Sequence, residues 1–334
     1  MARPIAALGW LSWGDHGAGM VEGDMSNTAT AALLSRMGDR LHLTDGGLET
    51  AMIFHEGLEL PHFAAFTLLG RPEGRAAMRR YFTGFLDQAA RLDLGFVLDT
   101  ATWRASEGWG ETMGLQPGEI DRLNREAVAF AQSLRDAHGA GEALVNGVLG
   151  PHGDAYRPDS VLGPEEAFDY HHRQVGVLAD EGVDLVTAMT ISSTGEAIGI
   201  AEAAQDVGVP VALSFTVETD GRLIDGMTLA EAIGVTDAAT KGYPAWYGVN
   251  CAHPDHFAAE LRGAWTGRLG LIRANASRLS HAELDEATEL DDGDPEELAR
   301  AYAAIRMRLP GLRVLGGCCG TDLRHVAAIG RECH

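Results

Sequence analysis

The sequence predicts a single-domain α/β fold, a (β/α)8 TIM barrel, and three observations lead to it. Short apolar runs alternate with longer segments of helical periodicity from residue 41 onward. Each of eight such runs is followed by one helical segment, and this alternation is typical of a parallel sheet. Eight units in about 290 residues match the usual size of a (β/α)8 barrel.

The eight expected strands are short and apolar, and cover residues 41–44, 95–99, 143–149, 185–189, 211–215, 245–249, 268–272 and 313–315. The expected helices carry apolar residues three and four apart, and cover residues 75–91, 117–137, 164–181, 195–207, 228–240, 254–263, 295–309 and 322–330. Several helices begin with Pro or Asp, which favour a first turn. A doubly wound open sheet is the alternative. It is disfavoured because no Gly-x-Gly-x-x-Gly turn follows the first strand.

The first forty residues differ in composition from the rest of the chain. They hold several glycines and two tryptophans, and no basic stretch there precedes a long apolar core, so we do not expect a signal peptide. We expect residues 1–40 to be an N-terminal extension that is poorly ordered or packs on a partner subunit. Residues 41–334 would then form the barrel. Residues 274–294 are polar and acidic, which predicts a long loop after the seventh strand.

The composition excludes several classes of partner. A formal charge of −22 disfavours binding to nucleic acid and to anionic membranes, both of which need basic patches. No stretch approaches the roughly 20 apolar residues of a membrane span. Only four cysteines are present, and they form no disulfide-like pattern, which suits a reducing cytoplasm. We therefore expect a cytoplasmic protein that acts on small molecules; a homo-oligomer is an open alternative.

Two adjacent cysteines near the C-terminus are the strongest chemical signal. They lie in the run Gly316-Gly317-Cys318-Cys319-Gly320. Adjacent residues seldom form a disulfide with each other, whereas flanking glycines let two sulfurs converge on one soft metal ion. Cys251 follows the sixth expected strand. Three thiolates with one open position are typical of a catalytic Zn2+ site rather than a closed structural one.

The barrel prediction brings these cysteines together. Cys251 follows strand six, while Cys318 and Cys319 follow strand eight. Active sites in this fold lie at the C-terminal ends of the strands. Asp45, at the end of strand one, falls on the same rim. Cys333 lies beside the C-terminus, where we expect a frayed end outside the site.

Three motifs resemble the homocysteine S-methyltransferase family. They are Leu43-Thr44-Asp45-Gly46-Gly47-Leu48-Glu49-Thr50, Gly248-Val249-Asn250-Cys251 and Gly316-Gly317-Cys318-Cys319-Gly320. The resemblance covers residues 41–330 and implies a (β/α)8 barrel in which the motif cysteines bind zinc. It also implies transfer of a methyl group to a zinc-bound thiol, homocysteine by default, giving methionine. The donor would be S-methylmethionine, S-adenosylmethionine or a betaine-like compound.

The resemblance also assigns substrate contacts. It implies that Asp45, beside Gly46, contacts the substrate amino group; the alternative is that Asp45 caps the following turn. Asn250 would orient a zinc ligand or bind substrate, unless it forms a turn. Thr102 and Trp103 follow strand two, where the family has pocket-lining residues, although Trp103 could be a core aromatic. Asn275 matches a family loop asparagine after strand seven, in a poorly matching context.

One departure from the family concerns Met189. Family members carry a glutamate at this place, just before a threonine, which helps to hold the substrate ammonium. A thioether cannot pair with an ammonium group. Either another carboxylate replaces the glutamate, with Glu196 and Glu218 as candidates, or the substrate is not ordinary homocysteine. A second departure is His152, where the family often has an aromatic residue.

These departures leave other functions open. The acceptor could be a different thiol or a selenol, or the chain could be a non-catalytic paralogue that binds zinc and a thiol. A redox barrel with a disulfide between Cys318 and Cys319 is a third interpretation, which bond strain disfavours.

Overall fold

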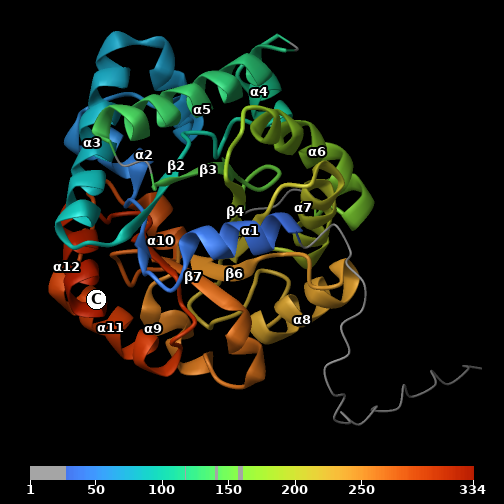
Figure 1. Ribbon diagram of the computed structural model, residues 1–334, viewed down its shortest axis with the longest axis vertical. Coiled ribbons are helices and arrows are strands. Elements are labelled where there is room, and N and C mark those ends of the chain that lie inside the picture. The colour runs from blue at the N-terminus through green and yellow to red at the C-terminus, as the bar shows by residue number, and fades with distance from the viewer. Residues whose placement is uncertain (1–27, 117, 140–141, 157–160) are drawn as a thin grey trace, which may run out of the picture.

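The computed structural model describes residues 28–116, 118–139, 142–156 and 161–334. Within them, eight parallel strands pair in chain order and close into a barrel, which confirms the predicted fold (Figure 1). The pairing of Leu43 with Leu315 joins the first strand to the last. The strands are β1 (His42–Leu43), β2 (Gly95–Asp99), β3 (Leu144–Leu149), β4 (Leu185–Ile191), β5 (Val211–Phe215), β6 (Trp246–Asn250), β7 (Leu269–Ala274) and β8 (Val314–Gly317).

Helices follow the strands and surround the barrel (Figure 1). The main ones are α3 (Pro72–Arg91), α5 (Glu119–His138), α6 (Pro164–Asp180), α7 (Thr194–Val207), α8 (Leu229–Thr240), α11 (Pro295–Arg308) and α12 (Leu323–Cys333). Short helices in the loops are α2 (Leu48–Thr50), α4 (Glu107–Thr112), α9 (Pro254–Phe257) and α10 (His281–Glu286).

Helix ends follow the local sequence. Asp294 accepts hydrogen bonds from the backbone of Glu296 and Glu297, and Pro295 fills the first helical position of α11. The helix predicted over 254–263 is shorter than expected. It ends at Phe257, whose φ of −131° leaves the helical region before a single 3-10 turn.

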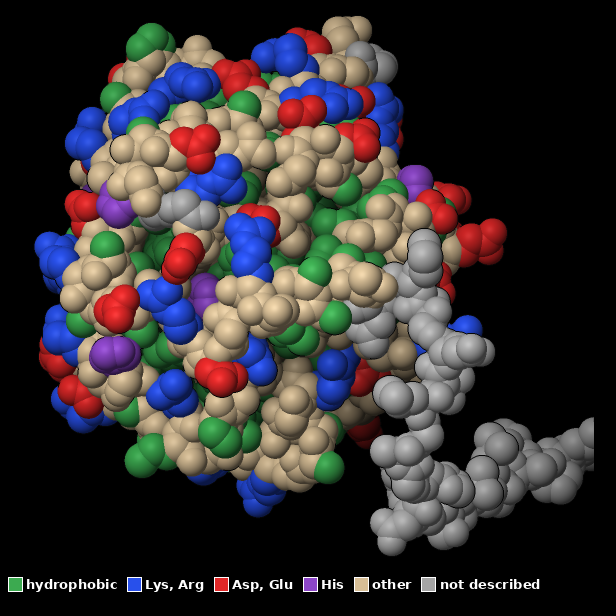
Figure 2. All heavy atoms as spheres, in the orientation of Figure 1, with side chains coloured by type: hydrophobic (Ala, Val, Ile, Leu, Met, Phe, Trp, Pro, Cys, Tyr) green, Lys and Arg blue, Asp and Glu red, His purple; other side chains and the backbone are tan. Residues whose placement is uncertain are grey.

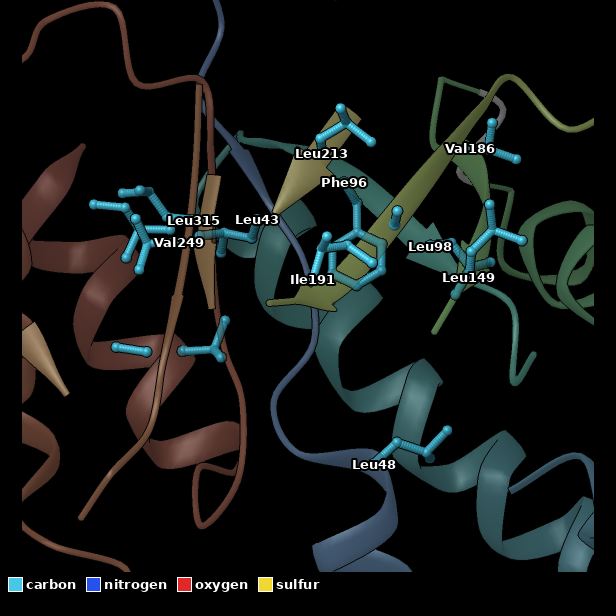
Figure 3. Close-up of a cluster of buried hydrophobic side chains, with 14 of the residues drawn as sticks. Leu43, Leu48, Phe96, Leu98, Leu149, Val186, Ile191, Leu213, Val249 and Leu315 are labelled. Carbon is cyan, nitrogen blue, oxygen red and sulfur yellow. The ribbon is translucent and has the colours of Figure 1, made fainter. Parts of the chain in front are cut away.

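Alternate strand residues form two apolar layers. One layer lies between the strands and the helices, and Figure 3 shows Leu43, Phe96, Leu98 and other members of it projecting from the strands. The other layer fills the barrel itself and includes Val97, Leu144, Leu185, Ala212, Trp246, Leu271 and Val314. The barrel is thus a packed core that supports a site at its rim.

Part of the expected N-terminal extension belongs to the barrel. Residues 1–27 lie outside the described residues, but helix α1 (Thr28–Met37) runs across one end of the barrel (Figure 1). Leu33 and Met37 are buried in the same cluster as the barrel interior. Arg36 also forms an ion pair with Asp184, directly before β4. The expectation of a loose or partner-packing segment is therefore wrong for residues 28–37, whose apolar face closes the N-terminal end of the barrel.

The C-terminal end of the chain differs from the prediction. Cys333 is 3% exposed in the last turn of α12, so the expected frayed end is instead packed in the core.

Acidic and basic side chains are interspersed on the face that carries α1 (Figure 2). None of the described helices combines the length and apolarity that a bilayer crossing requires.

Candidate metal centre and substrate pocket

A cavity of about 420 Å³ opens at the C-terminal ends of the strands. Its lining comes from the loops after most strands of the barrel and includes Asp45, Thr100, Trp103, Asn250, Cys251 and Cys318. This volume lies within the range of small-molecule sites. The predicted rim is therefore the place where a substrate can reach the predicted metal ligands.

The three predicted cysteine ligands meet at this cavity. The Sγ atom of Cys251 lies 3.2 Å from that of Cys318 and 3.6 Å from that of Cys319, and all three sulfurs lie within 4.8 Å of one another. Tetrahedral zinc with bonds near 2.3 Å separates its sulfur ligands by about 3.8 Å. The cluster thus fits a zinc ion in both donor type and spacing, with one coordination position left for another ligand.

The backbone around the cysteines explains the glycines of the motif. A Cβ on Gly316 would lie 2.3 Å from Thr44, and one on Gly317 would lie 2.0 Å from the Thr321 hydroxyl. Gly320 has a φ of +76°, which favours glycine. Cys251 adopts a φ of +58° without being a glycine. Such a conformation is costly and is found where the surroundings enforce it, often at functional sites.

Neighbouring groups favour a negative charge on one sulfur of the cluster, whereas the adjacent thiols and burial raise the pKa values of Cys251 and Cys319. Hydrogen bonds from Cys251 and Cys319, together with the charge of Arg273, hold the pKa of the Cys318 thiol well below its usual range. The Tyr156 ring stacks on His281 with centroids 4.0 Å apart, and Tyr156 lines the cavity together with Cys251. The pKa of Tyr156 is raised by burial and by the nearby thiols, so the hydroxyl stays a donor. Thiolate is the form that binds metal.

A buried ion triad lies beside the cluster. Arg273 on β7 donates from Nη2 to Asp45 Oδ1 at 2.6 Å and pairs through Nη1 with Asp99. The other oxygen of Asp45 accepts from the Tyr81 hydroxyl at 3.0 Å. Burial raises the pKa of Asp45 to about 6, although Arg273 opposes the shift. Asp45 lines the cavity as expected, but both its oxygens already have partners, so its contact with a substrate amino group stays a prediction.

Three further residues predicted to contact substrate, Asn250, Met189 and Trp103, lie at the cavity. Asn250 lines the cavity; its amide oxygen accepts from the backbone of Thr190 at 2.8 Å, and its nitrogen lies 4.0 Å from Cys318 Sγ. This arrangement agrees with orientation of a metal ligand. Met189 and Trp103 also line the cavity, where the Trp103 indole lies 3.5 Å from the Met189 carbonyl.

Thr102 and Gly46 have packing roles. Thr102 is fully buried, and its hydroxyl donates to the Val148 carbonyl at 2.7 Å. It does not line the cavity, so the expectation for Thr102 is wrong, and Thr100 occupies that wall instead. Gly46 lines the cavity, and a Cβ there would lie 2.6 Å from the Thr321 carbonyl. Asn275, also on the wall, donates to the Cys251 carbonyl at 3.0 Å.

Neither carboxylate considered as a replacement for the missing glutamate faces the cavity. Glu196 accepts from the His152 backbone and lies 2.9 Å from His171. The His152 ring packs edge-on against Tyr170 instead of lining the cavity. Glu218 pairs with His281 at 3.0 Å outside the main cavity.

Sequence reasoning missed four residues of the site: Glu49, Arg104, Tyr156 and Arg273. Glu49 lies inside the first motif, and Arg104 directly follows Trp103, so their positions were visible in the sequence although no role followed from them. Arg273 lies two residues before Asn275 on β7. Only the barrel geometry shows that its side chain crosses to the end of β1.

Comparisons with known proteins show the family of the chain. Residues 42–333 match the family described as homocysteine S-methyltransferase. Homocysteine S-methyltransferase 4 of Zea mays is 26% identical over 314 residues, covering 86% of this chain and 88% of the relative. The homocysteine S-methyltransferase of Escherichia coli K12 is 27% identical over 246 residues, covering 69% of this chain and 77% of the relative.

Solved structures show the same fold. The homocysteine methyltransferase MmuM from Escherichia coli, in its oxidized form, has a TM-score of 0.72 and 24% identity, covering 92% of this chain and all 100% of that one. Its metallated form has a TM-score of 0.69. These structures show the fold alone, whereas the family match defines the chain as a methyltransferase. The chain belongs to the homocysteine S-methyltransferase family.

Proposed function

We propose that the protein is a zinc-dependent S-methyltransferase that converts homocysteine to methionine with a methyl group from an activated donor. The observation that supports it most is the cluster of Cys251, Cys318 and Cys319 at the wall of the cavity. The three sequence motifs and the family membership support it as well. The similar Escherichia coli enzyme has also been solved in a metallated form.

The three cysteines would hold the zinc ion. Zinc, when bound, would keep the acceptor sulfur as a thiolate near neutral pH, where a free thiol with a pKa near 8.5 is mostly protonated. Asn250 lies 4.0 Å from Cys318 Sγ, and Asn275 fixes the Cys251 carbonyl, so both residues orient ligands. The cavity walls would place acceptor sulfur and donor methyl group in line, since positioning accounts for much of such a rate enhancement.

The donor belongs to the same proposal. The cavity wall combines acidic groups with the aromatic ring of Trp103, and this setting favours a positively charged sulfonium such as S-methylmethionine. S-adenosylmethionine and a betaine-like donor carry a similar charge. A second candidate acceptor, a different thiol or a selenol, is favoured by Met189, which supplies no charge to the wall.

Metal content and activity test this proposal together. The purified protein, loaded with zinc, should contain about one zinc ion per chain and form methionine from homocysteine and S-methylmethionine. Cys318→Ser should lose both properties, because it removes one of three ligands. Cys333→Ala is the matched control, since Cys333 is a cysteine outside the cluster. Absence of methionine with every sulfonium or betaine donor, despite bound zinc, would reject the homocysteine reaction.

The cysteine cluster also supports a proposal about the cellular compartment of the protein. Thiolate ligands must remain reduced, and the structure shows all four cysteines free. We therefore propose a reducing compartment, the cytoplasm.

A further inference from the structure

One carboxylate of the cavity wall, that of Glu49, lies beside the cysteine turn without an ionic partner among the described residues. Among the described residues, the Glu49 side chain forms no ion pair, and its one hydrogen bond is to its own backbone. Asp45, the other acidic group beside the cluster, is bound by Arg273 and Tyr81. Glu49 is therefore the acidic group near the cysteines that is available to a ligand.

Glu49 is fixed next to the metal-binding turn by its neighbours. A Cβ on Gly47 would lie 2.6 Å from the Cys318 carbonyl, so the two backbones are in contact. The Thr50 hydroxyl accepts from the Gly320 backbone at 3.3 Å. Helix α2 thus sits on the cysteine turn, and Glu49 lies between the two contacts with its side chain on the cavity wall.

A guanidinium group, that of Arg104, also lines the cavity. Arg104 is held between two indole rings, with its Cζ 4.2 Å from the Trp103 centroid and 4.0 Å from the Trp109 centroid. One nitrogen donates to the Gly153 carbonyl at 2.7 Å, but Nε has no partner among the described residues. Arg104 forms no ion pair in the described part of the chain, and the carboxylate charges that act on it are those of Asp154 and, more weakly, Glu49. The stacking fixes the cation in place.

We propose that Glu49 and Arg104 determine acceptor specificity by binding the ammonium and the carboxylate of an α-amino acid whose thiol reaches the cysteine cluster. This inference rests on the proposed function and assigns the recognition of its acceptor. It explains how a chain with Met189 on the wall, and with Asp45 bound to Arg273, can still bind a zwitterion. An ammonium group supplies the positive partner that Glu49 lacks, and a carboxylate fits the planar donor edge of Arg104.

Binding of truncated thiols to the cobalt-substituted protein tests this assignment. Thiolate binding to Co2+ gives a charge-transfer absorption band, so the dissociation constant is measured without turnover. The three probes are homocysteine, 4-mercaptobutanoate, which lacks the amino group, and 3-mercaptopropylamine, which lacks the carboxylate. Wild type should bind homocysteine about 10- to 100-fold more tightly than either truncated thiol, as expected for loss of a charged hydrogen bond.

The variants separate the two roles. Glu49→Gln should bind homocysteine and 4-mercaptobutanoate with similar affinity, while still discriminating against 3-mercaptopropylamine. Arg104→Met should show the reverse pattern. Glu59→Gln, an exposed carboxylate outside the cavity on the same loop, is the matched control and should keep both preferences. Because each variant is judged by a ratio of two ligands, a general loss of affinity does not alter the result.

Two outcomes are distinguishable. If wild type binds homocysteine and Glu49→Gln keeps the full preference over 4-mercaptobutanoate, then Glu49 serves only its own helix turn and the assignment is overturned. If no thiol perturbs the cobalt spectrum of wild type, the proposed function itself fails.

Discussion

Arg273 shows how single residues shape this site. Its guanidinium lies between the carboxylates of Asp45 and Asp99 and also donates to the Gly317 carbonyl at 2.9 Å. The three ionised groups are almost fully buried, so each depends on the others for compensation. The triad therefore ties the ends of β1, β2 and β7 to the glycines that precede the cysteine turn.

Removal of the Arg273 guanidinium should destabilise the folded protein. Arg273→Met leaves two buried carboxylates without an opposite charge and should lower the free energy of unfolding by about 3–5 kcal/mol. The triple variant with Asp45→Asn and Asp99→Asn should recover part of that loss, because no charge then remains buried. Urea denaturation of the metal-free proteins measures both values. If the unfolding free energy of Arg273→Met lies within about 1 kcal/mol of the wild-type value, the three charged groups do not depend on one another for stability.

At the scale of elements, the two ends of the chain close the barrel. Helix α1 covers the N-terminal end, with Leu33 and Met37 in the interior cluster. Helix α12 packs beside α11 and buries Cys333. Both elements were underestimated from the sequence, because a terminal position gives no local signal of tertiary packing.

The role of α1 can be measured at Met37. Met37→Ala creates a cavity in the barrel interior and should destabilise the protein by about 2–4 kcal/mol. Ser35→Ala, an exposed position on the same helix, should change the stability by no more than about 0.5 kcal/mol. Thermal and urea unfolding of both variants check the difference. Equal stability of the two variants would mean that α1 does not contribute to the core.

The buried thiol of Cys333, in helix α12, should make the stability of the protein depend on pH. Burial raises the pKa of Cys333 from an ordinary value of 9.0 to about 11. The folded state therefore favours the protonated thiol, so this contribution is complete below pH 9 and is lost as the pH rises through 11. Two pKa units correspond to at most about 3 kcal/mol.

A comparison of wild type with Cys333→Ala isolates this contribution. The stability advantage of wild type over the variant should shrink between pH 8 and pH 11, as measured by urea unfolding at each pH. A constant difference across that range would contradict a buried neutral thiol at residue 333.

At the scale of the whole molecule, the sequence predicts most of the fold and the cysteine site. Periodicity reports burial directly, so the strands and the main helices were predictable within a few residues. The cysteines were predictable as a cluster because the C-terminal ends of all strands share one rim. The pairing of Arg273 with Asp45, across 228 positions of the chain, was not, since it depends on which way each side chain points. The prediction for Thr102 fails because this residue lies in the irregular segment after β2, where the alternation of a strand no longer indicates the side-chain direction.

The barrel rim carries the three cysteine sulfurs, Asp45 paired with Arg273, and the proposed ligand-binding residues Glu49 and Arg104. The barrel supports the site on several strand ends, which keeps the distances between its groups fixed. We propose that the acceptor sulfur joins the three cysteines on one zinc ion.

X-ray absorption at the zinc edge tests this claim most directly. The zinc-loaded protein should show three sulfur neighbours near 2.3 Å and one lighter atom. Addition of homocysteine should replace the lighter atom with a fourth sulfur at about the same distance. An unchanged spectrum at saturating homocysteine would contradict the account.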